Sequence, residues 1–358
     1  MTAHHRFDDI SIEDLVAQGS MKWTRNEGHL AAFVAEMDFG TAPAVSEALH
    51  TAIDHAQLGY LPPAVKNDMS QATRDYLTSH YDWKVAPGQI YPTADVLSAY
   101  TVVLETLSRP GAPVILPTPA YMPFLTLTPA RGREVIQVPM IEGENGRVEM
   151  DLVGIAHAFE RGAEMFILCN PHNPLGRVYS REELEALAAV VDAHQGLVFS
   201  DEIHAPLTFP GHRHIPYASL SETTAHHTIT ATSASKAFNI PGLKCAQLIV
   251  SSPQHHETLE KVAFMVSHGA ATPGATANTA AYQSGGPWLE DVLSYIDTNR
   301  TLLADLLEKH LPQMGYRAPE GTYIAWLDAT GLPPVAGDRS WAQFFSDEAK
   351  VGLTDGAL

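Results

Sequence analysis

The sequence predicts an α/β protein whose mainly parallel central sheet is covered by helices on both faces. Short apolar runs alternate with longer segments that carry apolar residues at helical spacing, a pattern typical of strands joined by crossover helices. The runs with strand character are 89–91, 113–117, 134–138, 165–169, 197–200, 228–232 and 246–251. Ligands of such sheets bind beyond the carboxyl ends of the strands, so the residues that follow these runs are the first candidates for a site.

Helices are predicted between these runs. The clearest start is at Ser180, because Ser180 and Glu183 have the spacing of a capping box, in which the two side chains satisfy free amides of the first turn. The predicted helices are 44–58, 64–80, 95–107, 181–196, 288–310 and 341–350, and one more strand is expected at 323–327. Residues 1–45 show little sign of regular structure.

We expect three parts along the chain. Residues 1–44 form an N-terminal arm that belongs to a small domain, residues 45–285 form a large domain, and residues 286–358 form the C-terminal small domain. The segment 288–310 is the expected connection between the last two parts.

Composition excludes several classes of function. The 358 residues carry a net charge of −19, which argues against binding to nucleic acid or to an anionic membrane, because both need basic patches. The two cysteines, Cys169 and Cys245, give no disulfide framework. The first nine residues have no apolar core of a signal peptide, and no apolar run is long enough to span a bilayer. We therefore expect a soluble cytoplasmic protein.

Four chemically distinctive residues follow predicted strand ends on one side of the sheet: Tyr121, Asn173, Asp201 and Lys236. A lysine amine loses its proton readily when it is buried or lies beside another cation, which makes it a nucleophile or a base. Taken singly, each residue has an ordinary interpretation, such as a core aromatic, a turn, a helix cap or an exposed lysine. Their shared position favours one common ligand.

The motif Ser233-Ala234-Ser235-Lys236 after a strand resembles the cofactor-lysine motif of fold-type I pyridoxal phosphate (PLP) enzymes. Over nearly its whole length the chain is similar to class I/II aminotransferases, and more narrowly to the MalY/PatB-type cystathionine β-lyases, which are C–S lyases. The matching segments are 35–39, 59–60, 170–176, 200–204, 214–216, 233–243 and 319–326. The segment 200–204 is the most specific for the lyases, because many aminotransferases have tyrosine at the position of His204.

This resemblance implies a PLP-dependent transferase-like fold and assigns roles to individual residues. Lys236 is expected to be the Schiff-base lysine, Asp201 to pair with the pyridine nitrogen, Asn173 to meet the phenolic oxygen and Tyr121 to stack on the ring. Tyr60 is expected to reach the cofactor of a neighbouring subunit, which implies a homodimer. Catalysis is assigned to Lys236, Asp201 and Tyr60. The other residues expected at the cofactor are Ala94, Asp95, His204, Ser233, Ser235 and Lys244.

The implied reaction is α,β-elimination from L-cystathionine or another cysteine S-conjugate, giving a thiol, pyruvate and ammonia. An aminotransferase on the same scaffold is the main alternative. A regulatory binding protein is a second, although no motif supports it. A metal site is a third, because His204, His212 and His214 lie close in sequence, but their spacing matches no zinc pattern.

The sequence departs from the family pattern at four places. Glu36 stands where aspartate is common, and Lys244 stands where many relatives have arginine, which loses the bidentate fork. Asp95 stands in the turn expected to hold the phosphate, where a carboxylate is unfavourable unless it points away. Relatives bind the substrate carboxylate with an arginine that we do not find before Leu358, so no residue is assigned to that role.

Overall fold

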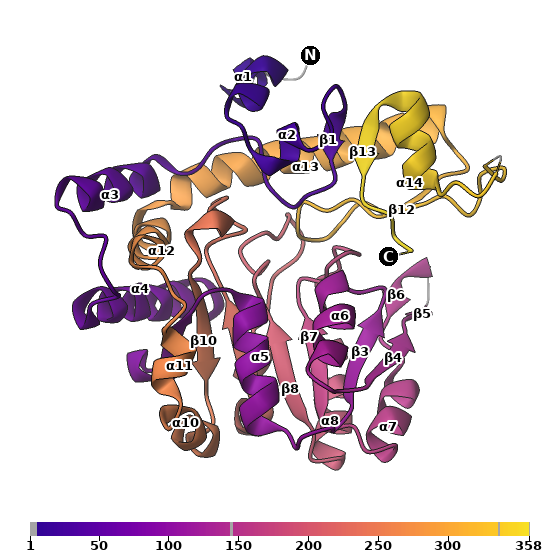
Figure 1. Ribbon diagram of the computed structural model, residues 1–358. Helices are drawn as coiled ribbons and strands as arrows, with labels where there is room; N and C mark the ends of the chain where they lie inside the picture. The colour runs from indigo at the N-terminus through magenta and orange to yellow at the C-terminus, as the bar shows by residue number, and fades with distance from the viewer. Residues whose placement is uncertain (1–5, 144–145, 336, 358) are drawn as a thin grey trace.

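The computed structural model describes residues 6–143, 146–335 and 337–357; the first five residues, which belong to the predicted arm, lie outside the described residues. At its centre is a seven-stranded sheet with the order β2-β10-β9-β8-β7-β3-β4 (Figure 1). The strands are β2 (Ile90–Thr93), β3 (Val114–Thr118), β4 (Val135–Pro139), β7 (Met165–Cys169), β8 (Leu197–Asp201), β9 (Thr228–Thr232) and β10 (Ala246–Val250). Only β10 runs against its neighbours in this sheet, so the prediction of a mainly parallel sheet is confirmed.

Side chains of the sheet alternate between two cores. In β7, Met165 and Ile167 pack with α5 (Val96–Leu107) and α6 (Met122–Ala130), whereas Phe166 and Leu168 pack with α7 (Leu152–Glu160) and α8 (Arg181–Ala193). Figure 1 shows α5 and α6 in front of the sheet. Each fully buried side chain of this size contributes about 2 kcal/mol. A register slip of one residue would send every side chain to the wrong face, so both cores fix the pairing.

The remaining elements surround the sheet and extend beyond its carboxyl edge. Figure 1 shows the long α13 crossing above the sheet toward the C-terminal elements. These elements are α3 (Pro43–Asp54), α4 (Pro63–Tyr81), α9 (Glu222–His227), α10 (Pro253–Glu260), α11 (Ala263–Ser267), α12 (Thr272–Ser284), α13 (Gly286–His310), α14 (Trp341–Phe344) and the short pairs β5 (Ile141–Glu142) with β6 (Val148–Glu149) and β11 (Gly315–Tyr316) with β12 (Leu327–Asp328). Near the two ends of the chain, β1 (Leu30–Ala32) pairs in parallel with β13 (Val351–Leu353).

The capping box predicted at the start of α8 is present. The Glu183 amide donates to Ser180 Oγ at 3.2 Å, and the Ser180 amide donates to Glu183 Oε2 at 2.8 Å. The predicted helix at 44–58 ends earlier, at Asp54, because Ala56 adopts a φ of +54° and the chain turns there.

Three other expectations differ from the structure. Residues 1–45 contain η1 (Arg6–Asp9), α1 (Ile12–Ala17), α2 (Met21–Thr24) and β1, so they hold more regular structure than the sequence suggested. The predicted strand 323–327 is irregular up to Leu327, because Thr322 has a φ of +69° and the Ile324 amide donates to Thr322 Oγ1 at 3.1 Å instead of to a neighbouring strand. The helix predicted at 341–350 is divided between α14 and a π-helical turn, Phe345–Ala349.

Within the described residues, no helix combines the length and the apolar character needed to cross a bilayer.

Candidate active site

The predicted site residues meet at one edge of the sheet. Asp201, the last residue of β8, is in register with Cys169 on one side and Ala231 on the other. Tyr121 follows β3 and is the N-cap residue of α6, Asn173 follows β7, and Lys236 follows β9. Because these strands are parallel, their carboxyl ends bring the four side chains to the same edge.

The Lys236 amine is held in a mostly buried position. Its Nζ donates to the carbonyl oxygen of Ala35 at 3.0 Å. Burial lowers the pKa of Lys236, while the negative charges of Glu36 and Asp201 act in the opposite direction. A lowered pKa increases the fraction of neutral amine at physiological pH, which is the form that attacks an aldehyde or accepts a proton.

Asp201 is 4% exposed, and the Ile203 amide donates to its Oδ1 at 3.2 Å. Burial raises the pKa of Asp201 to about 7, and the charge of Glu202 adds to the effect, whereas the Ile203 hydrogen bond and the charge of Lys236 oppose it. A buried carboxyl group in this state lacks a strong cationic partner. A protonated nitrogen of a ligand placed here would supply one.

Tyr121 and His204 lie next to this pair. Burial raises the pKa of Tyr121, and the nearby charge of Asp201 raises it further. His204 is buried, and burial together with the charge of Lys236 lowers its pKa to about 3, so the imidazole is neutral. Its Nδ1 has no hydrogen-bond partner within the described part of the chain. Buried polar atoms normally have partners, so this nitrogen is available to a ligand.

Asn173 is placed by the turn that follows β7. Its amide donates to the Sγ of Cys169 at 3.4 Å, and this sulfur also lies 3.5 Å from the carbonyl oxygen of Pro171. Cys169 and Cys245 are both free and buried, and burial raises the pKa of both thiols. The thiol of Cys169 therefore acts as a neutral hydrogen-bonding group that supports the turn carrying Asn173.

The residues predicted near a phosphate group differ in their burial and in their hydrogen-bond partners. Ser233 Oγ donates to the Cys245 carbonyl at 2.7 Å and accepts from the Ser235 amide at 3.0 Å, so its hydroxyl braces the turn before Lys236. Lys244 is 59% exposed, and its Nζ lies 3.1 Å from Asp95 Oδ2. The carboxylate of Asp95, which the sequence placed unfavourably in the turn expected to hold the phosphate, is thus paired with a cation.

Asp95 instead caps α5, just after Ala94. Its Oδ1 accepts from the amide and from the hydroxyl of Ser98, both at 2.7 Å. These hydrogen bonds and the charge of Lys244 lower the pKa of Asp95 against the opposing effect of burial, which is the largest single influence. The carboxylate is therefore negative at the helix N-terminus, where the helix dipole favours an anion.

Two other predicted features do not come together at the centre. The Tyr60 side chain is 93% exposed in the connection between α3 and α4, so it does not contact Lys236 of its own chain. Of the three histidines considered for a metal site, His204 lies by Lys236, His214 pairs with Glu202, and His212 is exposed. In the part of the chain that the structure describes, no group of three His, Cys, Asp or Glu side chains could hold a metal ion.

A buried network behind Asp201 was not assigned from the sequence. Glu202 directly follows Asp201 and accepts from Ser200 Oγ at 2.8 Å, from the Tyr217 amide at 3.0 Å and from His214 Nε2 at 3.0 Å. His214 and the two residues after it stood among the family-like motifs, but no pattern of spacing predicts that His214 reaches the strand end. The network fixes the backbone on which Asp201 stands.

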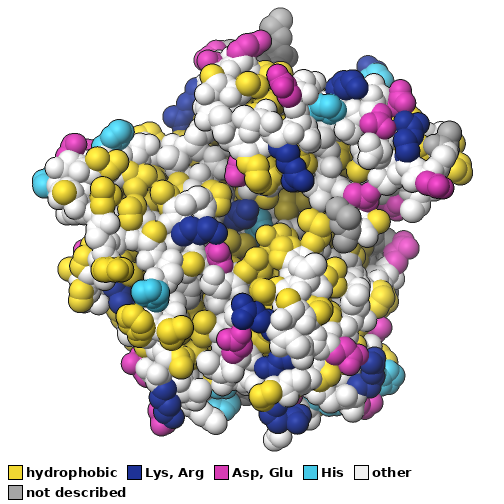
Figure 2. Space-filling view, viewed as in Figure 1, with side chains coloured by type: hydrophobic (Ala, Val, Ile, Leu, Met, Phe, Trp, Pro, Cys, Tyr) yellow, Lys and Arg dark blue, Asp and Glu magenta, His cyan; other side chains and the backbone are white. Residues whose placement is uncertain are grey.

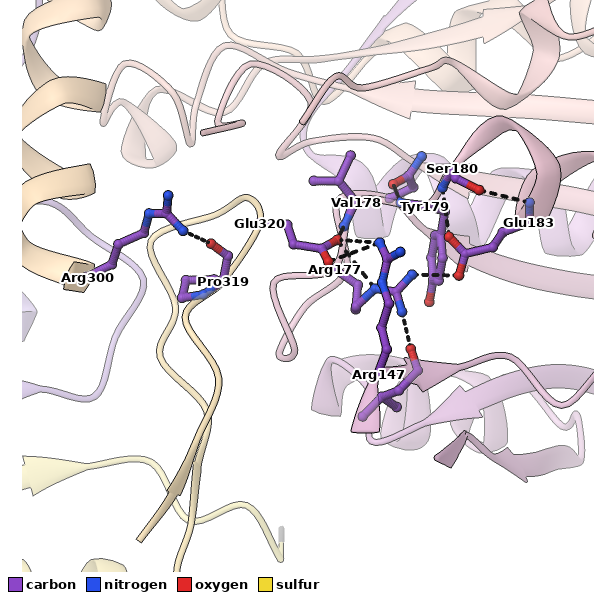
Figure 3. Close-up of polar contacts among 11 residues, drawn as sticks. Arg147, Arg177, Val178, Tyr179, Ser180, Glu183, Arg300, Pro319 and Glu320 are labelled. Carbon is purple, nitrogen blue, oxygen red and sulfur yellow. Dashed lines mark hydrogen bonds and ion pairs between the residues drawn. The ribbon is translucent and has the colours of Figure 1, made fainter. Parts of the chain in front are cut away.

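A second network joins the loop after β7 to the segment that precedes Tyr323. Figure 3 shows Glu320 reaching toward Arg147, Arg177 and the backbone of Val178. Its carboxylate accepts from the Val178 amide at 2.8 Å, lies 3.0 Å from Arg147 and lies 3.4 Å from the buried Arg177. This network holds the residues after α13 against the loop that carries Asn173.

The chain is similar to known proteins over most of its length. The family described as aminotransferase class I and II matches residues 34–356. The chain belongs to the class I and II aminotransferase family. The cystathionine beta-lyase of Corynebacterium glutamicum is 34% identical over 349 residues, which cover 97% of this chain and 90% of that protein. The cystathionine beta-lyase PatB of Bacillus subtilis is 33% identical over 359 residues, which cover 96% and 90%. The PLP-bound C-S lyase from Staphylococcus hominis superimposes with a TM-score of 0.87 at 28% identity and covers 99% of this chain and 90% of that one.

Members of this family use PLP, and the residues present here fit that cofactor. The buried amine of Lys236 can bond to its aldehyde, and the carboxyl group of Asp201 has the burial and protonation state suited to its ring nitrogen. The unpartnered Nδ1 of His204 supplies a polar atom on the same side. The similarity to a PLP-bound relative and the chemistry of these side chains both indicate PLP as the cofactor.

Proposed function

We propose that this aminotransferase-family protein is a PLP-dependent C–S β-lyase that cleaves L-cystathionine and related cysteine S-conjugates. The products are a thiol, which is homocysteine when the substrate is cystathionine, together with pyruvate and ammonia. The observation that carries the proposal is the buried pair of Lys236 and Asp201 at the strand edge, in a chain about a third identical to cystathionine β-lyases.

Each residue has a defined task in this proposal. PLP, when bound, withdraws electrons from the α-carbon of the substrate. Lys236 would anchor the cofactor, take the α-proton as a general base once its amine is free, and return that proton to the leaving sulfur. Asp201 would hold the proton of the ring nitrogen, and Asn173 would donate to the phenolic oxygen. Tyr121 would cover one face of the ring.

The imidazole of His204 supports a lyase over an aminotransferase. It occupies the position at which many aminotransferases have tyrosine, and it is neutral because its pKa is lowered to about 3. The relatives that carry lyase names provide the second support. An aminotransferase would return the proton from Lys236 to the cofactor, so the two reactions separate at that proton transfer.

The test is an assay of purified protein with L-cystathionine, in which free thiol and pyruvate are measured together. We expect both products in equal amounts, and we expect neither from Lys236→Ala. A parallel reaction with a keto acid, monitored for amino-group exchange, detects the aminotransferase. A cofactor-loaded protein that exchanges amino groups but releases no thiol would refute the lyase function.

We further propose that two chains form a homodimer in which Tyr60 completes the neighbouring site. Large apolar side chains are exposed near Tyr60 and on α11: Ile53, Leu58, Phe264 and Met265. Figure 2 shows hydrophobic side chains gathered over the side that holds α3, α4 and α11. Burial of such a patch in an interface would remove it from water.

We also propose that residues 1–44 and 286–358 form one small domain beside the large domain 45–285. The pairing of β1 with β13 supports this division, because it joins the two ends of the described chain.

A further inference from the structure

The carbonyl oxygen of Ala35 receives two hydrogen bonds from opposite parts of the chain. Lys236 Nζ donates to it at 3.0 Å, and the hydroxyl of Tyr323 donates to it at 2.9 Å. Burial, together with the charge of Glu36, raises the pKa of Tyr323, so its hydroxyl keeps its proton and remains a donor. One carbonyl of the arm therefore lies between the amine of the proposed base and a fixed phenol.

The arm is attached to the loop that carries Lys236. The Met37 amide donates to Asn239 Oδ1 at 2.9 Å, and Asn239 Nδ2 donates back to the Met37 carbonyl at 2.8 Å. The hydroxyl of Thr41 donates to the Phe238 carbonyl at 2.6 Å. These contacts run along the arm, and Met37 and Phe238 also share one apolar core. The arm and the lysine loop therefore form one unit, with Ala35 at the end next to the amine.

Tyr323 is held in place from the other side. The Thr322 amide donates to the Leu207 carbonyl at 2.7 Å, and Thr322 is fully buried with a φ of +69°. A β-branched residue rarely adopts this conformation, so the surrounding contacts must maintain it. The Glu320 network in Figure 3 and the Glu320 amide, which donates to the Gly176 carbonyl at 2.8 Å, provide such contacts. The position of the Tyr323 phenol is thus fixed against the large sheet.

We propose that the Ala35 carbonyl orients the free amine of Lys236 during catalysis and that Tyr323 is the positioning residue for this carbonyl. The inference rests on the proposed function only in that Lys236 acts as the base. When one N–H of the amine points to Ala35, tetrahedral geometry leaves the lone pair only the two remaining positions on the nitrogen, both directed away from Ala35. The lone pair then takes the α-proton: the C–H bond breaks and an N–H bond forms. In the elimination the C–S bond breaks, and the ammonium gives this proton to the sulfur, which restores the neutral amine.

The test is Tyr323→Phe, which keeps the ring and removes only the hydroxyl, in the cofactor-loaded enzyme. The matched control is Tyr316→Phe, because the Tyr316 hydroxyl donates to the Arg300 carbonyl at 3.5 Å and not to the arm. We expect kcat for cystathionine to fall about tenfold in Tyr323→Phe, with KM unchanged, because one hydrogen bond that orients the base is lost. The control should retain the wild-type kcat.

Two measurements separate this inference from the lyase assignment. Exchange of the α-proton of L-alanine for deuterium, followed by NMR, reports the action of Lys236 as a base in either a lyase or an aminotransferase, and it should slow about tenfold in Tyr323→Phe. Hydrogen exchange of the backbone amides in residues 33–38 should become faster in the same variant and remain unchanged in the control. The inference is wrong if Tyr323→Phe exchanges the α-proton of L-alanine at the wild-type rate. It is also wrong if this variant raises KM while hydrogen exchange of the amides in residues 33–38 stays unchanged. If wild type exchanges alanine but releases no thiol, the lyase assignment fails and the inference stands.

Discussion

Replacement of Asp201 by asparagine should change how the stability of the cofactor-free protein depends on pH. Burial raises the pKa of the Asp201 carboxyl group to about 7, whereas its ordinary value is 3.8. Between these values the folded protein keeps a proton that the unfolded chain has released. The resulting stabilisation is fully present below pH 3.8 and is lost as pH rises through about 7. From pH 4.5 to pH 7.5 the free energy of unfolding should fall by about 3 kcal/mol through this group.

Other buried groups titrate in the same pH range, but their contribution to stability rises with pH. Burial lowers the pKa of His204 and of His172 to about 3, and that of His227 to about 4. These histidines contribute their full stabilisation above pH 6.5, which is the ordinary pKa of histidine. This contribution is lost as pH falls toward 3. The slope of the wild-type protein alone therefore sums contributions of both signs, and the difference between wild type and Asp201→Asn isolates the carboxyl group.

The assay is urea unfolding of both cofactor-free proteins at pH 4.5, 5.5, 6.5 and 7.5. Relative to wild type, Asp201→Asn should gain about 3 kcal/mol of stability between the lowest and the highest pH, because asparagine does not ionise. A cofactor that brings a protonated nitrogen to Asp201 should abolish this gain, since it favours the carboxylate. A difference between the two proteins that stays constant over the four pH values would refute the argument that burial keeps Asp201 protonated.

Two more predictions concern the edge of the site. Asp95→Asn removes the carboxylate that pairs with Lys244 at 3.1 Å. Because the freed cation can then attract the phosphate, PLP should bind about fivefold more tightly in a fluorescence titration. Unchanged or weaker binding would show that Lys244 does not meet the phosphate. Tyr60→Ala and Lys236→Ala should each be inactive, but a mixture of the two, unfolded and refolded together, should regain about a quarter of wild-type activity, because half of the dimers then contain one intact site. No recovery in the mixture would contradict a shared site.

The sequence predicted the strands of the central sheet and the residues that follow them because both depend on local patterns. A fully buried strand such as Met165–Cys169 is a continuous apolar run, and parallel strands necessarily end at one edge. Once Asp201 was placed at such an end, its nearness to Lys236 followed from topology alone. The order of the residues along the chain was sufficient for this part of the site.

Other features depend on contacts between distant segments. The strand predicted at 323–327 is apolar and aromatic, but the backbone at Thr322 is turned by its contact with Leu207, and no local pattern reports that contact. The hydrogen bond of Tyr323 to Ala35 joins residues nearly a whole chain apart and ends on a backbone oxygen, which every residue type shares. The direction of the Ser233 hydroxyl toward the Cys245 carbonyl is likewise set by the fold and not by the Ser-x-Ser-Lys pattern.

Burial acts on Lys236 and Asp201 in the same sense, since it favours the neutral form of both groups. It lowers the pKa of the amine and raises the pKa of the carboxyl group to about 7, although each group's charge opposes the shift of the other. A neutral amine is the form that can bond to an aldehyde, and a protonated carboxyl group holds the proton that a ring nitrogen requires. In a protein with a net charge of −19, protonation of Asp201 also removes one source of repulsion toward a phosphate group. In the proposed function, the burial that makes this edge of the sheet costly for charges therefore favours the neutral forms in which Lys236 and Asp201 would receive the cofactor.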